Sequence, residues 1–281
     1  MTARRLAMLV GMLAGLAAPA RAGEVPVGLE LVLAVDVSGS IDEAEAQLQR
    51  DGYLKAIAHP RVVAAIRSGI LGRIAVTYIE WAGRGWQTKV LDWTLIGDAN
   101  SARGFARALT RAPIDSGPWT SIGDAIDFAA PMFRANGFEG TRRVIDISGD
   151  GPNNVGRYVA DARDGAVAQC ITINGLAIMN DRPNFIRSPM PNLDLCYRNC
   201  VIGGSGAFIV VTRDFKDFAA AIRRKLVLEI AGKSLPDGVL PRVRRQLAMY
   251  HGAFPLSAPR SWVPPCDEGE RRFQGTRFDE W

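Results

Sequence analysis

The sequence predicts an α/β fold: a doubly wound, mostly parallel central sheet with one antiparallel edge strand and helices on both faces. Short, nearly continuous apolar runs recur along the chain, and amphipathic stretches separate most of them. A strand of a parallel sheet is buried on both faces and therefore consists of such an apolar run. Alternation of these runs with helical patterns is typical of βαβ units. With 281 residues, 48% of them hydrophobic, the chain has enough apolar material for a sizeable core.

The first buried strand is expected over residues 29–36, and a helix should follow and end at His59-Pro60. The start of this helix matches a capping box in two registers, Ser40 with Glu43 or Asp42 with Glu45. Further apolar runs cover residues 73–81, 89–95, 143–147, 170–178 and 207–211, and amphipathic stretches cover 100–109, 121–133, 155–168 and 215–230. The runs at 73–81 and 89–95 are joined by a short glycine turn, which indicates a hairpin and hence the antiparallel edge strand.

Residues 1–22 have the pattern of a signal peptide: Arg4 and Arg5, an apolar run over 6–18, and the cleavage motif Ala20-Arg21-Ala22. The alternative is a transmembrane anchor, but the apolar run is shorter than the ~20 residues that span a bilayer. We expect cleavage after Ala22 and a mature chain in the periplasm or outside the cell. No later segment is long and apolar enough to cross a membrane, so no span is expected after cleavage.

The remaining chain is expected to form one domain over residues 23–231, with residues 232–281 as a proline-rich tail packed on it and one short helix near 243–251. Cleavage removes three of the 34 basic residues and none of the 29 acidic ones, so the mature chain is nearly neutral. Nucleic-acid binding requires a concentrated basic face, and the basic clusters here are short. A nucleic-acid partner is therefore not expected.

Four cysteines remain in the mature chain: Cys170, Cys196, Cys200 and Cys266. In an exported chain an even number indicates disulfides, here two, for which three pairings exist. We favour Cys200–Cys266, which would tie the tail onto the domain. A zinc site is the alternative, but the sequence has no C-x-x-C pair and only two histidines.

A chemically distinctive motif, Asp36-Val37-Ser38-Gly39-Ser40, follows the first buried strand. In an extended chain its three oxygen-bearing side chains point to one side. Ligands of open α/β sheets bind outside the carboxyl ends of the strands, and Mg²⁺ prefers oxygen ligands. The structural alternative is that Ser40 caps the helix while Asp36 binds loop amides.

Strand, D-x-S-x-S and helix together are similar to the metal-ion-dependent adhesion site of von Willebrand factor type A domains. That family also has a Thr in a G-x-T-x-x-G-like loop and an Asp-Gly after a central strand, and this chain has residues 117–123, GPWTSIG, and Asp150-Gly151. The resemblance implies one divalent ion, Mg²⁺ or else Mn²⁺ or Ca²⁺, with the ligands Asp36, Ser38, Ser40, Thr120 and Asp150. Ser121 remains an alternative to Thr120. Asp146 competes with Asp150 but lies inside its strand, so we prefer Asp150.

The chain resembles more closely an exported bacterial family called domain of unknown function 1194, through residues 147–154, ISGDGPNN, and 201–204, VIGG. The wider von Willebrand resemblance implies that neutral hydroxyl ligands leave the ion electrophilic, so that a carboxylate of a protein partner completes its coordination. The implied function is an exported, adhesion-type protein-binding module. Its partner surface would include Trp119, Ser121, Asn153 and Asn154. For Trp119 the alternative is packing within its loop, and for the asparagines it is a turn with Asx bonding.

The sequence offers little to an enzyme. Only His59 and His251 could serve as a catalytic base, and there is no phosphate loop or dinucleotide motif. We therefore expect a protein that is not an enzyme. Two alternatives stay open: metal-assisted phosphoester hydrolysis in the same crevice, with Asp36 and Asp150 as ligands, or a structural domain with a vestigial site. The partner's identity and the oligomeric state do not follow from the sequence.

Overall fold

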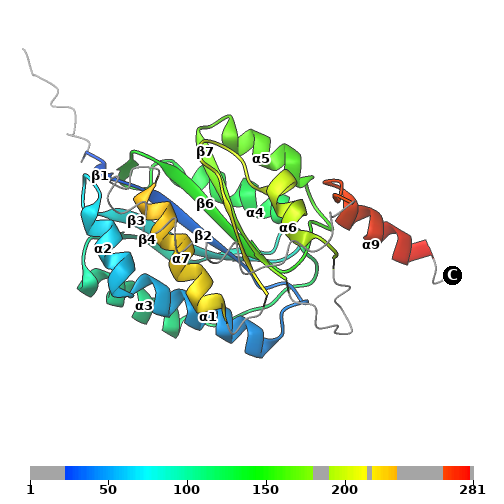
Figure 1. Ribbon diagram of the computed structural model, residues 1–281, viewed down its shortest axis with the longest axis horizontal. Coiled ribbons are helices and arrows are strands. Elements are labelled where there is room, and N and C mark those ends of the chain that lie inside the picture. Colours follow the sequence, from blue (N-terminus) through cyan, green and yellow to red (C-terminus); the bar gives the residue numbers. More distant parts are fainter. Residues whose placement is uncertain (1–22, 180–189, 214–216, 233–261, 279–281) are drawn as a thin grey trace, which may run out of the picture.

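The computed structural model describes residues 23–179, 190–213, 217–232 and 262–278 (Figure 1). Within these ranges six strands form one sheet in the order β4-β3-β2-β6-β7-β8. The strands are β2 (Glu30–Asp36), β3 (Ile74–Trp81), β4 (Gln87–Ile96), β6 (Arg143–Gly149), β7 (Ile171–Ile178) and β8 (Ile209–Thr212). All neighbours pair in parallel except β3 and β4, which pair antiparallel at one edge. The predicted fold class and its antiparallel edge strand are confirmed.

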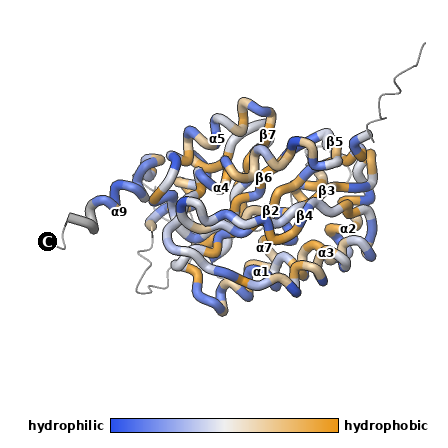
Figure 2. Tube along the Cα trace, turned by 180° about the vertical axis from the view of Figure 1, so that it is seen from behind, coloured by the Kyte–Doolittle hydropathy of each residue, from blue (hydrophilic) through white to orange (hydrophobic). Residues whose placement is uncertain are grey.

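The centre of the sheet is apolar because helices cover both of its faces. All seven residues of β2 are buried, and Figure 2 shows hydrophobic residues concentrated along the central strands. One face carries α1 (Glu43–Ile57), α2 (Pro60–Ser68), α3 (Ala99–Arg111) and α7 (Phe218–Ala231). The other carries α4 (Ile122–Ala129) with its 3₁₀ extension η1 (Ala130–Phe133), α5 (Val159–Val167), α6 (Leu193–Cys196) and the π-helical turn η2 (Tyr197–Val201). Figure 1 shows these two layers with the sheet between them.

Several short elements were not predicted. The helix after β2, α1, ends just before His59-Pro60 as expected, but Pro60 also begins a second helix, α2. A proline is tolerated at the first helical position because its missing amide needs no partner there. His59 caps this helix by accepting a hydrogen bond from the backbone N–H of Arg61. Four other short elements were missed because their sequences have no clear periodic pattern. They are the parallel strands β1 (Val25–Val27) and β5 (Phe138–Gly140), which pair with each other, and the helices α6 and η2.

The C-terminal helix α9 (Glu268–Phe278) was not predicted either. It lies at the end of the sheet beside α6 (Figure 1). The signal peptide at residues 1–22 and the helix expected near 243–251 lie outside the described residues. No helix in the described ranges has the length and apolar character that a membrane crossing requires.

One disulfide, Cys200–Cys266, joins η2 to the segment before α9, as expected. The expectation of a second disulfide is wrong, because Cys170 and Cys196 are both free thiols. Cys170 is exposed and directly precedes β7, at the amino end of that strand, whereas Cys196 is buried in α6. Burial, and then the charges of Glu270 and Glu268 of α9, raises the pKa of the Cys196 thiol to about 12. The two thiols therefore sit in different parts of the domain.

Candidate metal centre

The candidate site lies where the strand order reverses. From β2 the chain goes to β3 on one side, whereas β6 and β7 lie on the other, so the loops after β2 and β6 diverge. Such a switch point opens a crevice at the carboxyl ends of the strands. A third loop is added by an isolated parallel bridge between Ser38 and Gly117, with the Gly117 N–H donating to the Val37 carbonyl at 3.2 Å. All three predicted motifs therefore meet at one end of the sheet.

Asp36 is the last residue of β2 and is fully buried. Its Oδ1 accepts a hydrogen bond from the Ser38 backbone N–H at 2.7 Å, while its Oδ2 has no hydrogen-bond partner among the described residues. Burial, and then repulsion by Asp150, raises the pKa of Asp36 to about 8. A buried carboxylate oxygen without a partner is costly, and a cation would relieve that cost.

A chain of hydroxyl groups links the loops after β2 and β6. Ser40 Oγ donates to Asp150 Oδ1 at 2.6 Å, and Ser38 Oγ lies 3.0 Å from Ser40 Oγ. Because the single hydroxyl proton of Ser40 goes to Asp150, Ser38 is the donor in the second bond. The capping box of α1 is formed by Asp42 with Glu45, which leaves Ser40 to face the crevice.

Thr120 and Ser121 have different roles. Ser121 caps α4, its Oγ accepting from the Asp124 N–H at 3.3 Å. Thr120 is held by its backbone, which donates to Asn154 Oδ1 and accepts from the Asn154 N–H, both at 2.9 Å. Its Oγ1 faces the loop after β6, since a Cβ added to Gly151 would lie 3.8 Å from it. The structure thus brings the hydroxyl of Thr120 toward the loop of Asp150.

The competing carboxylate, Asp146, lies on the opposite side of β6 from the crevice. It forms a fully buried ion pair with Lys225 of α7. Asp150 instead follows β6 and contacts Ser40 across the crevice. Together Asp36, Ser38, Ser40, Thr120 and Asp150 provide three hydroxyl groups and two carboxyl groups at one place.

A protein family model described as "Protein of unknown function (DUF1194)" matches residues 26–234. The chain belongs to this family. No curated protein sequence matches the chain.

Three similar solved structures show that this DUF1194 protein has the fold of a von Willebrand factor type A domain. A von Willebrand factor type A structure from Catenulispora acidiphila matches at a TM-score of 0.51 with 14% identity, covering 73% of this chain and 43% of that one. Proximal thread matrix protein 1 from the mussel byssus matches at a TM-score of 0.53 with 14% identity, covering 75% of this chain and 49% of that one. The pilus adhesin SpaC from Lactobacillus rhamnosus GG matches at a TM-score of 0.52 with 14% identity, covering 74% of this chain and 31% of that one. The DUF1194 chain therefore spans less than half of each of these chains.

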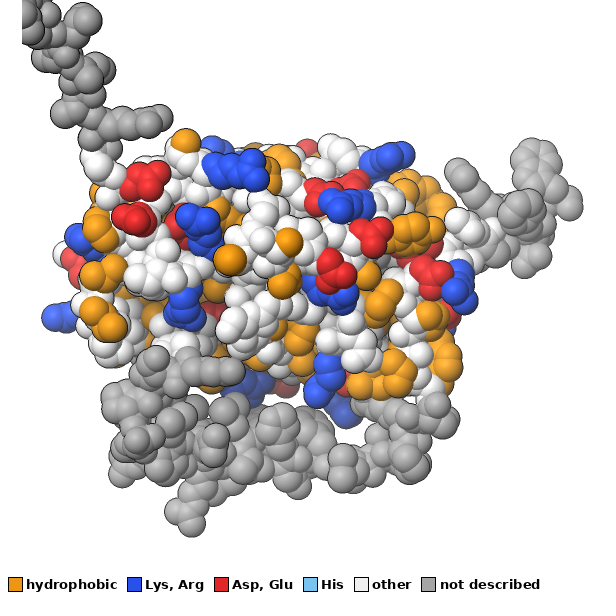
Figure 3. Space-filling model, turned by 90° about the horizontal axis from the view of Figure 1, so that it is seen from above, with side chains coloured by type: hydrophobic (Ala, Val, Ile, Leu, Met, Phe, Trp, Pro, Cys, Tyr) orange, Lys and Arg blue, Asp and Glu red, His pale blue; other side chains and the backbone are white. Residues whose placement is uncertain are grey.

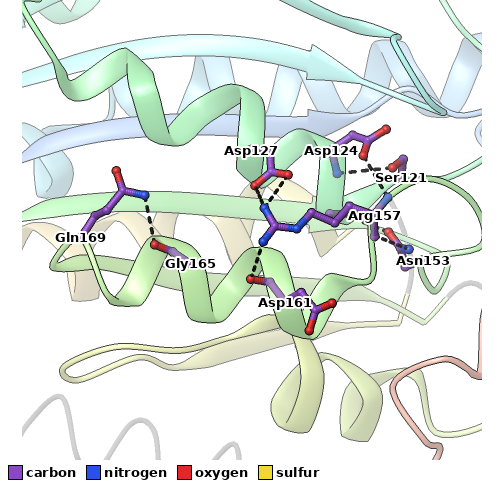
Figure 4. A network of polar contacts seen from close by, with 9 residues as sticks. Ser121, Asp124, Asp127, Asn153, Arg157, Asp161, Gly165 and Gln169 are labelled. Atoms are coloured by element: carbon purple, nitrogen blue, oxygen red, sulfur yellow. Dashed lines mark hydrogen bonds and ion pairs between the residues drawn. The ribbon is translucent and has the colours of Figure 1, made fainter.

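The loop after β6 is braced by Asn153 and Asn154, which the sequence had singled out, and by Arg157, which it had not. The Asn153 side chain accepts from the Gly123 N–H at 3.0 Å and donates to the Arg157 carbonyl at 3.1 Å. The Arg157 backbone N–H donates to Asp124, and its guanidinium pairs with Asp127 of α4 (Figure 4). Asn154 holds Thr120, so the two asparagines together brace the loops around the crevice. Asn153 also contacts α9.

Tyr197 of η2 is a further residue that sequence reasoning missed. A Cβ on Gly149 would lie 2.6 Å from the Tyr197 hydroxyl and 2.7 Å from Asp36 Oδ2, so both atoms flank this glycine. The Tyr197 hydroxyl is buried and has no hydrogen-bond partner in the described ranges. Burial, and then the charges of Asp36 and Asp150, raises the pKa of Tyr197 well above its usual value. The floor of the crevice at Gly149 is therefore lined by two oxygens without hydrogen-bond partners in the described ranges, Asp36 Oδ2 and the Tyr197 hydroxyl.

Trp119, next to Thr120, is held in an uncommon conformation at the rim of the crevice. Its φ of 65° is in the left-handed region, and 48% of the residue is exposed. The loop of Trp119 packs closely on Gly83, where an added Cβ would collide with the Pro118 carbonyl. Such strain in a non-glycine residue persists only where the surroundings impose it, and it clusters at functional sites.

Proposed function

We propose that this DUF1194 protein is an exported protein-binding module that holds one divalent ion at the crevice and docks an acidic group of a protein partner on it. The proposed ligands are Asp36, Ser38, Ser40, Thr120 and Asp150. The observation that carries the proposal is the hydroxyl chain Ser38–Ser40–Asp150 beside the unpartnered Oδ2 of Asp36.

The ligand chemistry favours a hard cation. Carboxylate and hydroxyl oxygens suit Mg²⁺, which we favour, and Mn²⁺ or Ca²⁺ as alternatives. No cluster of three or more His, Cys, Asp or Glu side chains that could hold a metal occurs in the described part of the chain. Hydroxyls would thus complete the set, and they leave the ion enough positive charge to attract a carboxylate. A mussel proximal thread matrix protein 1 structure with a zinc-occupied site of this type, at a TM-score of 0.50 and 14% identity, has the same fold.

The proposed location outside the cytoplasm has two supports. Residues 1–22 have the composition of a signal peptide, and the disulfide Cys200–Cys266 is of a kind that persists in oxidising compartments. We accordingly propose that the mature chain begins at residue 23 and acts in the periplasm or outside the cell.

Thermal unfolding of the mature chain in Mg²⁺ or Mn²⁺, against EDTA, tests the proposal. A ligand that binds only the folded state at 100 times its Kd stabilises that state by about 2.7 kcal/mol, so millimolar metal should raise Tm by several degrees. Asp36→Ala should abolish the rise because it removes a ligand. Asp92→Ala, an exposed carboxylate on β4, is the matched control and should keep it.

Three outcomes would contradict the proposal. If metal leaves the Tm of the wild type unchanged, the site is vestigial and the domain is structural. An unchanged rise in Asp36→Ala would place the ion elsewhere. Metal-dependent hydrolysis of p-nitrophenyl phosphate that is lost in Asp36→Ala would instead support a phosphoester hydrolase at this crevice.

A further inference from the structure

The C-terminal helix α9 packs against the rim of the candidate site. The ring of Phe273 lies edge-on to Trp119 with the ring centroids 4.5 Å apart. Glu270 Oε1 accepts a hydrogen bond from the Asn153 side chain at 2.7 Å. Gly269 lies so close to the Asn153 carbonyl that a Cβ there would collide with it. The first half of α9 thus covers the loop after β6 and the loop of Thr120. It contacts Trp119 and Asn153, two of the residues predicted to meet a partner.

This docked helix is held by a covalent tether rather than by a large apolar face. Figure 2 shows α9 as mostly hydrophilic. The disulfide Cys200–Cys266 anchors the chain just before the helix begins, and Asn192 donates to the Trp262 carbonyl at 2.9 Å. A tether of this kind gives the helix a high effective concentration at the rim, up to the millimolar range for short flexible connections. Weak contacts then suffice to keep α9 docked, and they also remain displaceable.

We propose that the rim formed by Trp119 and Asn153 is a docking surface for a helical segment that presents a carboxylate and an aromatic ring three residues apart, and that α9 occupies this surface in cis until such a partner displaces it. The proposal deepens the proposed function and rests on it, since the crevice beside this rim is where the partner's acidic group would bind.

The chemistry of α9 matches what the crevice should attract. Residues three apart lie on one face of a helix, so Glu270 and Phe273 meet the rim together. The Glu270 residue is only 8% exposed, and its Oε2 has no hydrogen-bond partner in the part of the chain that the structure describes. A buried carboxylate is therefore held against Asn153, in the loop that also carries Asp150. Trp119 keeps 48% of its surface exposed beneath this cover, so a longer partner helix could contact more of it.

A peptide-competition experiment with the full mature chain tests the proposal. The probe is a synthetic peptide of residues 262–278 with serine at position 266, labelled for fluorescence anisotropy. The double variant Glu270→Ala/Phe273→Ala removes the hydrogen bond to Asn153 and the ring contact with Trp119 but keeps the disulfide, so α9 should undock. We expect it to bind the peptide at least tenfold more tightly than the wild type, and we expect Trp119→Ala in that background to remove the gain. Arg271→Ala changes an exposed residue of α9 and should bind like the wild type.

Hydrogen exchange of the backbone amides of residues 268–274 provides a second measurement. These amides should exchange faster in Glu270→Ala/Phe273→Ala and at the wild-type rate in Arg271→Ala. Equal peptide binding by the wild type and the double variant, binding by neither, or unchanged exchange would overturn the proposal. Repeating the titration in EDTA distinguishes this proposal from the metal site. If the peptide competes with α9 but metal does not raise Tm, the proposed metal-dependent function is wrong and the docking role of α9 stands. If metal raises Tm but the peptide does not compete, only the docking role of α9 is wrong.

Discussion

At the scale of single residues, Gly149 shows how closely the floor of the crevice is packed. It ends β6 and lies between the Tyr197 hydroxyl and the carboxyl group of Asp36. Its φ is not in the left-handed region, so the requirement for glycine comes from space alone. Any side chain here would push on Asp36, which is the residue that the candidate site depends on most.

We therefore predict that Gly149→Ala destabilises the fold by about 1–3 kcal/mol, the usual cost of overpacking a core, and reduces the gain in unfolding free energy on adding Mg²⁺. Urea unfolding with and without Mg²⁺ measures both effects. Gly104→Ala in α3 is the matched control, because its Cβ would meet only the side chain of Arg107 at 4.0 Å. That variant should gain about 0.5–1 kcal/mol, as alanine does over glycine inside a helix. Equal behaviour of the two variants would refute this description of the crevice floor.

At the scale of elements, α7 is joined to the sheet by a buried charge cluster. Lys225 lies between Asp146 of β6 and Glu229, with its Nζ 2.7 Å from Glu229 Oε1, and all three side chains are fully buried. Asn174 of β7 also donates to Glu229, at 3.2 Å. Burial, and then the charge of Asp146, raises the pKa of Glu229 to about 8. One lysine does not neutralise two carboxylates, so the cluster retains a proton at moderate pH.

This proton predicts a pH dependence of stability. The carboxyl of Glu229 ordinarily loses its proton near pH 4.5 but in the folded protein holds it up to about pH 8. Because the folded state binds the extra proton between these values, stability from this group is complete below pH 4.5 and is lost as the pH rises toward 8. Glu229→Gln, which needs no proton, should become progressively more stable relative to the wild type over this window. Chemical denaturation at pH 5, 6.5 and 8 measures the trend.

A parallel trend for the wild type and Glu229→Gln would show that the proton is not held in this cluster. Lys225→Met provides the contrast, because it leaves two buried carboxyl groups without their cation. Removing one partner of a buried ion pair costs about 3–5 kcal/mol, so this variant should be strongly destabilised at neutral pH. The destabilisation of this variant should be smaller at low pH, where the carboxyl group of Glu229 holds its proton.

At the scale of the whole molecule, the parts that could be predicted from sequence are those with strong local patterns. Buried parallel strands are apolar runs, so β2, β3, β6 and β7 could be recognised, and the D-x-S-x-S spacing placed Asp36, Ser38 and Ser40 at a strand end. The choice of Asp150 over Asp146 also followed from position in the strand. Polar contacts between distant segments leave no such pattern. Tyr197 and Arg157 lie far from the D-x-S-x-S motif in sequence, and only the fold brings them to the crevice and its loops.

The C-terminal helix was missed for a related reason. Its residues are polar and give little amphipathic periodicity, and it is positioned by Cys200–Cys266 and by contacts with Trp119 and Asn153. Pairing of cysteines likewise depends on distance in the fold, so an even count was misleading for Cys170 and Cys196. On the face seen in Figure 3, acidic and basic side chains are interspersed. Recognition of a partner would then depend on the local chemistry of the crevice more than on a long-range field.

The central claim is that one divalent ion binds where the loops after β2 and β6 meet the loop before α4. Equilibrium dialysis of the mature chain against Mn²⁺, with the unbound ion measured by electron paramagnetic resonance, tests it most directly. We predict one Mn²⁺ per chain, displaced by Mg²⁺, with affinity lowered at least tenfold in Ser40→Ala, abolished in Asp150→Ala and retained in Asp92→Ala. Absence of Mn²⁺ binding by the wild type at millimolar concentration, or wild-type binding by Asp150→Ala, would contradict it.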